Sequence, residues 1–125
     1  NLVAPQPDFK SVFSILRNRI KYGDVVISAY PVLQRIYLGD AGLWLSQTSV
    51  LGNIDFYSGV KAVKTTADLA NITTSRHGYV LIYRQMISGG SVGSRIHYLF
   101  NSNRFKLLYH DSGPSIYDGI WLFEF

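Results

Sequence analysis

Short runs of β-branched and aromatic residues, separated by glycine and polar residues, dominate this chain after residue 23. Runs of this kind are typical of strands, because branched and aromatic side chains pack well on the half-buried faces of a sheet. A glycine-containing hairpin signal lies at 39–42, and residues 67–75 are expected to form a helical turn or a loop, with a short turn favoured. The strand-like runs are 24–29, 35–38, 43–45, 56–57, 60–66, 79–86, 95–100, 104–109 and 120–125.

One amphipathic helix is predicted before these runs. Apolar residues recur at spacings of three and four between residues 9 and 20, which places one apolar stripe along a helix. Asp8 precedes the stripe as a candidate N-cap, and Gly23 can end the segment. Residues 1–7 hold two prolines and are expected to form an extended arm. The sequence therefore predicts a single α+β domain over residues 1–125, with one N-terminal helix packed on an antiparallel β-sheet.

The composition limits the chemistry that is available. Apolar residues make up 47% of the chain and charged residues 16%, which excludes a disordered chain. No apolar run approaches the length of a membrane span, so we expect a soluble domain. The chain has no cysteine, and its three histidines lack metal-ligand spacing, so we predict neither a metal nor a cofactor. The net charge of +4 permits contact with RNA or an anionic surface.

Residues 88–113 carry the side chains most typical of a catalytic site. A Gly/Ser loop precedes Arg95, a predicted hairpin follows, and its second strand ends at His110. Tyr30-Pro31 follows an earlier short strand. This order resembles that of small guanyl-specific fungal ribonucleases, and barnase-type ribonucleases are similar. The resemblance implies that Tyr30 contacts a phosphate, that Arg95 stabilises the phosphorane transition state and that His110 is the general acid.

The set of groups needed for RNA cleavage is incomplete. Attack by the 2′-hydroxyl needs a general base, which is a carboxylate in this family. Val32 stands where the fungal pattern has a second histidine, and the run 79–86 holds no carboxylate. The one glutamate of the chain is Glu124, near its end. A second alignment, with 43–64 on the family pattern, also leaves the site incomplete. Three aspartates remain as substitute bases, although a capping or turn role is commoner for each: Asp55, Asp68 and Asp111.

The candidate RNA-binding residues have competing structural interpretations. Tyr30, Tyr109 and Tyr117 are candidate platforms for base stacking beside Arg95, but aromatic packing on the sheet is the commoner role of each. His97 follows Arg95 with one residue between them, so both would lie on one face of a strand. His97 is then either a second active-site histidine or a hydrogen-bonded sheet residue.

Two further features receive structural interpretations. His77 lies in a predicted turn and is expected to be exposed. The glycine-rich segment 89–93 lacks the Lys-Ser/Thr ending of a phosphate-binding loop and precedes a predicted strand, so we do not interpret it as such a loop.

Ribonuclease-like folds with incomplete sites resemble small secreted effectors of plant-pathogenic fungi, especially powdery mildews. The resemblance implies a secreted protein that acts inside the host cell and binds a host protein, an immune receptor or RNA. We also expect a monomer. Two alternatives stay open. The first is an active guanyl-type endoribonuclease that uses Arg95 and His110 with an unrecognised base. The second is a domain of the viral matrix type that binds polyanions or membrane surfaces.

Overall fold

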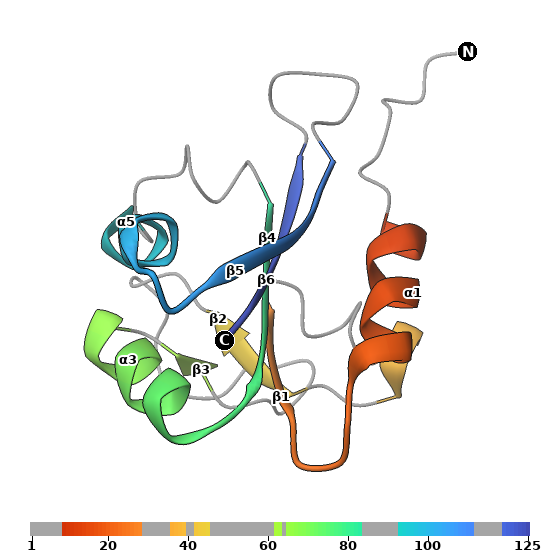
Figure 1. Cartoon of the computed structure of the whole chain (residues 1–125), viewed down its shortest axis with the longest axis horizontal. Coiled ribbons are helices and arrows are strands. Elements are labelled where there is room, and N and C mark those ends of the chain that lie inside the picture. The colour runs from red at the N-terminus through yellow and green to blue at the C-terminus, as the bar shows by residue number, and fades with distance from the viewer. Residues whose placement is uncertain are drawn as a thin grey trace.

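A six-stranded sheet forms the centre of the computed structural model (Figure 1). The structure describes residues 9–28, 36–39, 42–45, 62–63, 65–83, 93–111 and 119–125. The strand order across the sheet is β3-β2-β1-β4-β6-β5. The strands are β1 (Val25–Ser28), β2 (Leu43–Leu45), β3 (Ala62–Val63), β4 (Gly78–Tyr83), β5 (Lys106–Asp111) and β6 (Ile120–Glu124), and the helices are α1 (Phe9–Arg19), α3 (Thr66–Ser75) and α5 (Gly93–Asn101).

The sheet is mixed, which corrects the prediction of an antiparallel sheet. Strand β1 pairs in parallel with β2 and β4, and β2 pairs in parallel with β3. Strand β6 is antiparallel to both β4 and β5. Parallel neighbours need a crossover connection, whereas antiparallel neighbours can be joined by a hairpin. The broader prediction, a domain that combines helices with a sheet, is confirmed.

The turn signal at 39–42 illustrates this difference. Gly39 and Gly42 have positive φ angles of 76° and 57°, as their turn chemistry predicts. They do not join a hairpin, however, because the strand predicted over 35–38 is wrong: residues 36–38 form one helical turn, and the following strand β2 lies parallel to β1.

Two segments predicted as a strand and a turn are helical. The run 95–100 lies inside α5, and 67–75 lies inside α3. A capping box starts α3: the Thr65 hydroxyl accepts from the Asp68 amide, and the Asp68 carboxylate accepts from the Thr65 amide. The predicted strands at 24–29, 79–86, 104–109 and 120–125 are confirmed with shifted ends. The interpretations of Asp8, Tyr30, Val32, Asp55, Tyr117, the arm 1–7 and the run 56–57 concern residues outside the described ranges.

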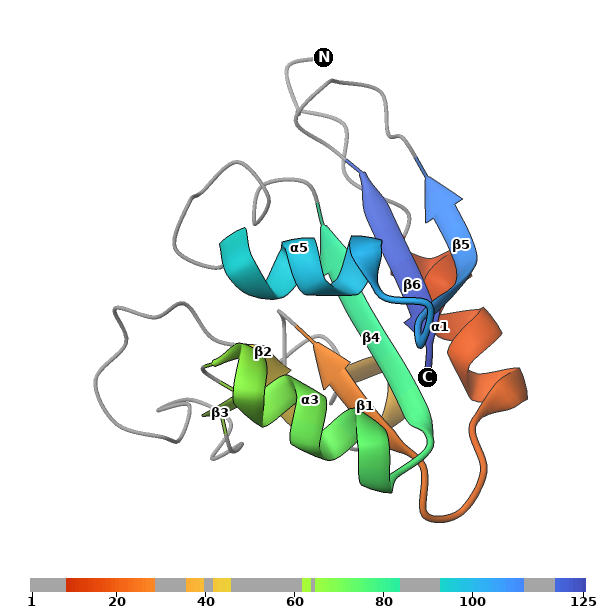
Figure 2. The same cartoon turned by 60° about the vertical axis from the view of Figure 1, so that its left-hand side comes forward.

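Helices lie on both faces of the sheet, with α1 on one face and α3 and α5 on the other (Figures 1 and 2). The predicted stripe of α1 is confirmed, because Val12, Phe13 and Leu16 are fully buried in a cluster with residues of β1, β4 and β6. On the opposite face, Leu69 of α3 and Leu99 of α5 join a second cluster with β1, β2, β4 and β6. Each such side chain contributes about 1.5–3 kcal/mol when it is buried. The two clusters hold the sheet between its helical layers.

Candidate functional site

Three titratable side chains from distant parts of the sequence meet at one end of the central strands of the sheet. Asp24 precedes β1, His77 precedes β4 and Glu124 ends β6. Strands β1 and β4 are parallel, so their first residues lie side by side. Strand β6 is antiparallel to β4, so its last residues lie beside the start of β4. His77 Nδ1 lies 2.7 Å from Asp24 Oδ1, and His77 Nε2 lies 2.8 Å from Glu124 Oε2. Two acceptors require an N–H on both ring nitrogens, which is the imidazolium form. We call Asp24, His77 and Glu124 the charged clamp.

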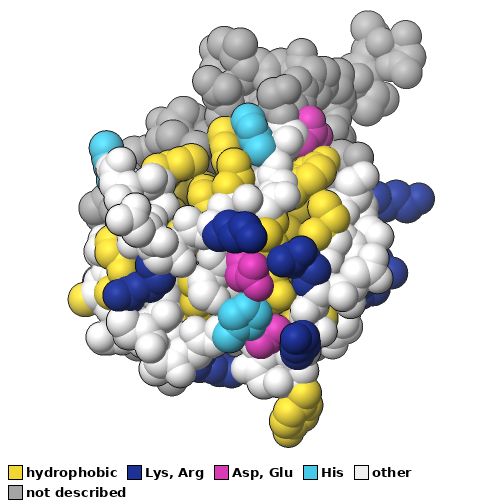
Figure 3. All heavy atoms as spheres, viewed as in Figure 1, with side chains coloured by type: hydrophobic (Ala, Val, Ile, Leu, Met, Phe, Trp, Pro, Cys, Tyr) yellow, Lys and Arg dark blue, Asp and Glu magenta, His cyan; other side chains and the backbone are white. Residues whose placement is uncertain are grey.

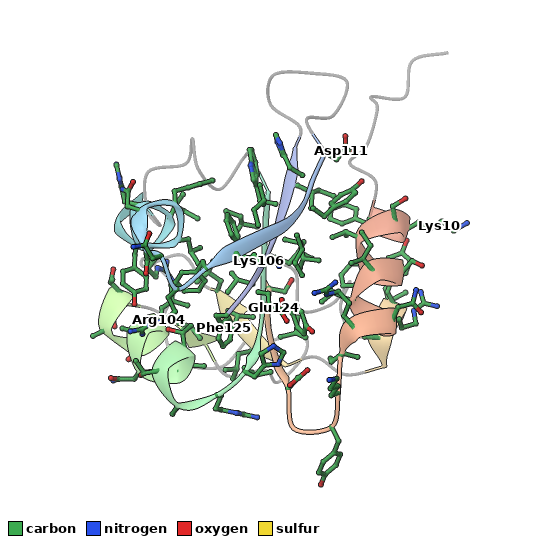
Figure 4. The ribbon with its side chains drawn as sticks, viewed as in Figure 1. Lys10, Arg104, Lys106, Asp111, Glu124 and Phe125 are labelled. Carbon is green, nitrogen blue, oxygen red and sulfur yellow. The ribbon has the colours of Figure 1, made fainter. Side chains whose placement is uncertain are left out.

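Neighbouring groups support the carboxylates of the charged clamp. The Lys21 amide donates to Asp24 Oδ2 at 2.9 Å, and Arg19 Nη2 lies 3.3 Å from Glu124 Oε1. The Tyr79 hydroxyl donates to the Arg19 carbonyl oxygen at 3.2 Å. Figure 3 shows a histidine between acidic side chains on this face, and Figure 4 places Glu124 near Lys106 of β5. A shallow polar depression of about 300 Å³ is lined here by Asn18, Arg19, Lys21, His77, Tyr79 and Glu124.

The contacts within the charged clamp shift the pKa of all three groups. The hydrogen bond to Asp24, followed by the bond to Glu124, raises the pKa of His77. Burial alone would raise the pKa of Asp24, but the hydrogen bonds from His77 and the Lys21 amide outweigh burial and lower it. The hydrogen bond from His77 lowers the pKa of Glu124, against the opposing effect of burial. An imidazolium that donates from both nitrogens has no free lone pair, so it cannot take a proton from a substrate. The charged clamp therefore ties three chain segments together.

Sequence reasoning missed the charged clamp. It placed Glu124 at a strand end near the C-terminus and expected His77 to be exposed. The exposure of His77 is confirmed at 48% of its side chain, but its bonds on both ring nitrogens were not predicted. The sequence held one indication of this cluster: each of the three residues borders or ends a strand. The parallel pairing of β1 with β4 and the antiparallel pairing of β4 with β6 make these strand ends neighbours.

Arg95 lies in the core of the domain. It belongs to α5, is 1% exposed, and its guanidinium donates to the backbone carbonyl of Val63 in β3. Burial lowers the pKa of Arg95, and the charge of Asp68 opposes that effect. A guanidinium enclosed in this way cannot reach a phosphate in solution.

His110 lies near the opposite side of the sheet from the Arg95 guanidinium. The carbonyl that Arg95 contacts belongs to β3 and His110 belongs to β5, and these are the two outer strands. Five inter-strand spacings of about 4.8 Å separate the two strands by roughly 24 Å. The prediction that Arg95 and His97 share a strand face is wrong, because both lie on α5, where Asn101 Nδ2 is 3.0 Å from His97 Nδ1. The structure therefore does not bring together Arg95 and His110, the two described residues among those that the ribonuclease resemblance implies.

An exposed aromatic surface lies where α5 meets β5 and β6. His110 stacks on Trp121, with ring centroids 4.5 Å apart and an interplanar angle of 15°. Phe100 contacts Trp121 edge-on, with a centroid distance of 6.0 Å. Phe100 is 46% exposed and Leu107 is 49% exposed. We call Phe100, Leu107, His110 and Trp121 the aromatic surface. Tyr109, the remaining described candidate for base stacking, packs instead against the cluster on the α1 face.

No family model, curated protein or solved structure matches this chain. No helix in the described part of the chain combines the length and apolar character that crossing a membrane requires. Within the same residues, no group of three or more histidine, cysteine or acidic side chains could hold a metal ion. The fold and the site define this chain as an α+β domain with a mixed sheet, a charged clamp at one end of its central strands and an aromatic surface beside an outer strand.

Proposed function

We propose that this domain is a non-catalytic binding module that recognises a protein partner through its aromatic surface. The observation that carries the proposal is the half exposure of Phe100 and Leu107 beside the stacked pair of His110 and Trp121. Large apolar side chains that cluster on the outside of a domain mark binding surfaces. Aromatic residues are also enriched at the centres of protein interfaces.

The charges around the aromatic surface favour a protein over RNA. Single-stranded RNA is bound by stacking platforms combined with cations that follow the phosphates. Arg95, the cation expected beside the platform, is buried. Lys106 is the register partner of Glu124, whose carboxylate contacts Arg19 near the C-terminal end of α1, so Lys106 lies on the α1 face of β5. The aromatic surface lies on the α5 face, where apolar contact is the main attraction.

This proposal keeps the non-catalytic part of the effector hypothesis. A secreted effector with a ribonuclease-like fold would use this surface on a host protein, such as an immune receptor. The active-ribonuclease alternative requires Arg95 and His110 on one phosphate, and their separation weighs against it. The matrix-type alternative requires binding to anionic vesicles that weakens steeply with salt.

Matched variants test the proposal by capture from plant leaf extract. Phe100→Ser combined with Leu107→Ser reduces the apolar area of the surface at two half-exposed positions. Ile36→Ser removes an apolar side chain that is 68% exposed in a separate helical turn, so it serves as the control. Retained proteins are identified by mass spectrometry, and binding is then measured by calorimetry with the purified partner.

The proposal predicts one partner that binds the wild type and Ile36→Ser alike. Binding to the double variant should be at least about tenfold weaker, because truncating an interface anchor typically costs more than about 1 kcal/mol. Equal binding to all three proteins would refute the aromatic surface as the site. Tight binding of a mixed-sequence single-stranded RNA, with no protein partner, would move the function to nucleic acid.

A further inference from the structure

Strand β5 forms one outer edge of the sheet, and the described part of the chain has no strand beyond it. An open edge presents backbone groups that can pair with another strand. We propose that β5 pairs antiparallel with β5 of a second copy of this chain, which makes a two-fold symmetric dimer with one continuous sheet. The inference rests on the proposed function, because it names a partner that covers part of the aromatic surface.

The charges of β5 are complementary to one another in this pairing. A two-fold axis through the middle of β5 places Lys106 of one copy opposite Asp111 of the other, and the same contact repeats at the other end. Figure 4 shows these residues at opposite ends of the strand. On β6 their register partners are Glu124 and Ile120, which contact the α1 side, so both charges lie on the α1 face. Opposite side chains on one face of an antiparallel pair have Cβ atoms about 4.5–5.5 Å apart.

The other face of β5 joins the two aromatic surfaces. The same alignment places Leu107 opposite His110 of the second copy. Their register partners on β6 are Phe123 and Trp121, which pack on the α5 face, so Leu107 and His110 share that face. The exposed Leu107 side chain of each copy then packs against the stacked ring pair of the other copy. Apolar area that is exposed in the single chain becomes covered at both ends of the interface.

The backbone of β5 fits the same alignment. Gly78 and Phe125 exchange both N–H···O bonds, so by alternation Phe123 and Trp121 turn their backbone groups toward β4. Their register partners on β5 are Leu107 and His110, whose backbone groups consequently face the open edge. In the proposed alignment, these two residues lie opposite each other in the two copies. The irregularity between Leu107 and Tyr109 falls next to the two-fold axis.

The charges on β5 favour a second copy of the same strand as its partner. Edge strands that avoid association are often short, and they carry proline, charges (commonly lysine) or a β-bulge. Strand β5 has a lysine and a register irregularity between Leu107 and Tyr109 but no proline, and its Lys106 and Asp111 have opposite signs at symmetric positions. The opposite signs attract the same two ends of a second copy. A six-residue edge makes a small interface, so we expect reversible self-association in the micromolar range or weaker.

Two charge reversals test this dimer. Sedimentation velocity and light scattering follow the mass of the wild type, Lys106→Asp and Asp111→Lys over a concentration series. We expect the wild type to dimerise and each variant to associate at least about tenfold more weakly, because like charges then face each other at both ends. An equimolar mixture of the two variants should restore a dimer, since every opposed pair is again of opposite sign. This restoration also shows that both variants are folded.

A wild type that stays monomeric over the whole series would overturn the inference. That outcome would agree with the monomer expected from the sequence. Dimers of the single variants as strong as those of the wild type, or no restoration in the mixture, would overturn it equally. The proposed function is scored separately by capture from leaf extract. Capture without self-association overturns the dimer alone, and self-association without capture overturns the host-protein partner alone.

Discussion

Replacing His77 with alanine should lower the stability of this domain in a pH-dependent way. The change removes two charge-assisted hydrogen bonds, of 2.7 Å to Asp24 and 2.8 Å to Glu124. The Asp24 side chain is 8% exposed, so losing its partner leaves a nearly buried carboxylate, at a cost of about 1–2 kcal/mol. Because His77 is half exposed, its contact with Glu124 contributes only about 0.5 kcal/mol to the free energy of unfolding. The total of about 2 kcal/mol corresponds to roughly 6–8 °C in Tm for a chain of this size.

The pH window follows from the directions of the pKa shifts. The pKa of His77 is raised, so its contribution is complete below the unfolded value near about 6.5 and disappears as pH rises through the higher folded pKa. The pKa values of Asp24 and Glu124 are lowered, so their contributions exist above about 4 and disappear as pH falls through the lower folded values. The charged clamp therefore stabilises the fold most between about pH 4.5 and 6.5.

Urea unfolding of the wild type and His77→Ala near pH 5.5 and pH 9, at about 0.15 M salt, measures this difference in the free energy of unfolding. The difference should be about 2 kcal/mol at the lower pH and clearly smaller at the higher pH. His97→Ala is the matched control, because that exposed histidine pairs with the uncharged Asn101 side chain one turn away on α5 and should not reproduce the pattern. A difference that is constant or that grows with pH would refute the doubly bonded imidazolium.

Three other substitutions give sharp expectations for stability. Gly78→Ala should prevent normal folding or destabilise by more than about 3 kcal/mol in urea unfolding, because a Cβ there would lie 2.0 Å from the Val25 carbonyl oxygen; mild destabilisation would contradict the close approach of β1 and β4. Thr65→Ala should cost about 1 kcal/mol by the same measurement, because the Asp68 amide loses its acceptor, and no change would mean that the cap is dispensable. Arg95→Ala should cost about 2–4 kcal/mol through a cavity and an unpaired Val63 carbonyl, whereas a stable variant that loses RNA cleavage would restore the catalytic interpretation.

The sequence predicts secondary structure best where the spacing of apolar residues fits only one kind of element. The stripe over residues 9–20 recurs at helical spacing for three turns, and α1 buries the central residues of that stripe. The run 95–100 is too short for such a decision. Ile96, Tyr98 and Phe100 fit strand alternation, but Arg95 and Leu99 are also one helical turn apart, and both are buried in α5. Burial against β3 and α3 selects the helix, and that choice depends on residues far away in the sequence.

Strand direction lies beyond local patterns for the same reason. The run 24–29 has the composition of a strand in either kind of sheet, and nothing near it specifies β4 as a parallel neighbour. That pairing decides which residues meet, because it places Asp24 beside His77 and keeps Arg95 at the far side of the sheet from His110. The order of arginine and histidine along the chain therefore resembles that of a ribonuclease, while the sheet holds these two side chains apart.

The two ends of β5 show how this reasoning extends to function. Lys106 and Asp111 carry no motif, and their significance depends on β5 being an outer strand. Once that position is known, their opposite signs and shared face specify a partner strand, and the neighbouring Leu107 and His110 supply the apolar contact. If β5 were an inner strand, the same residues would only pair with neighbouring strands of their own sheet. The charge-reversal pair thus tests the self-association and, at the same time, the strand order from which it was inferred.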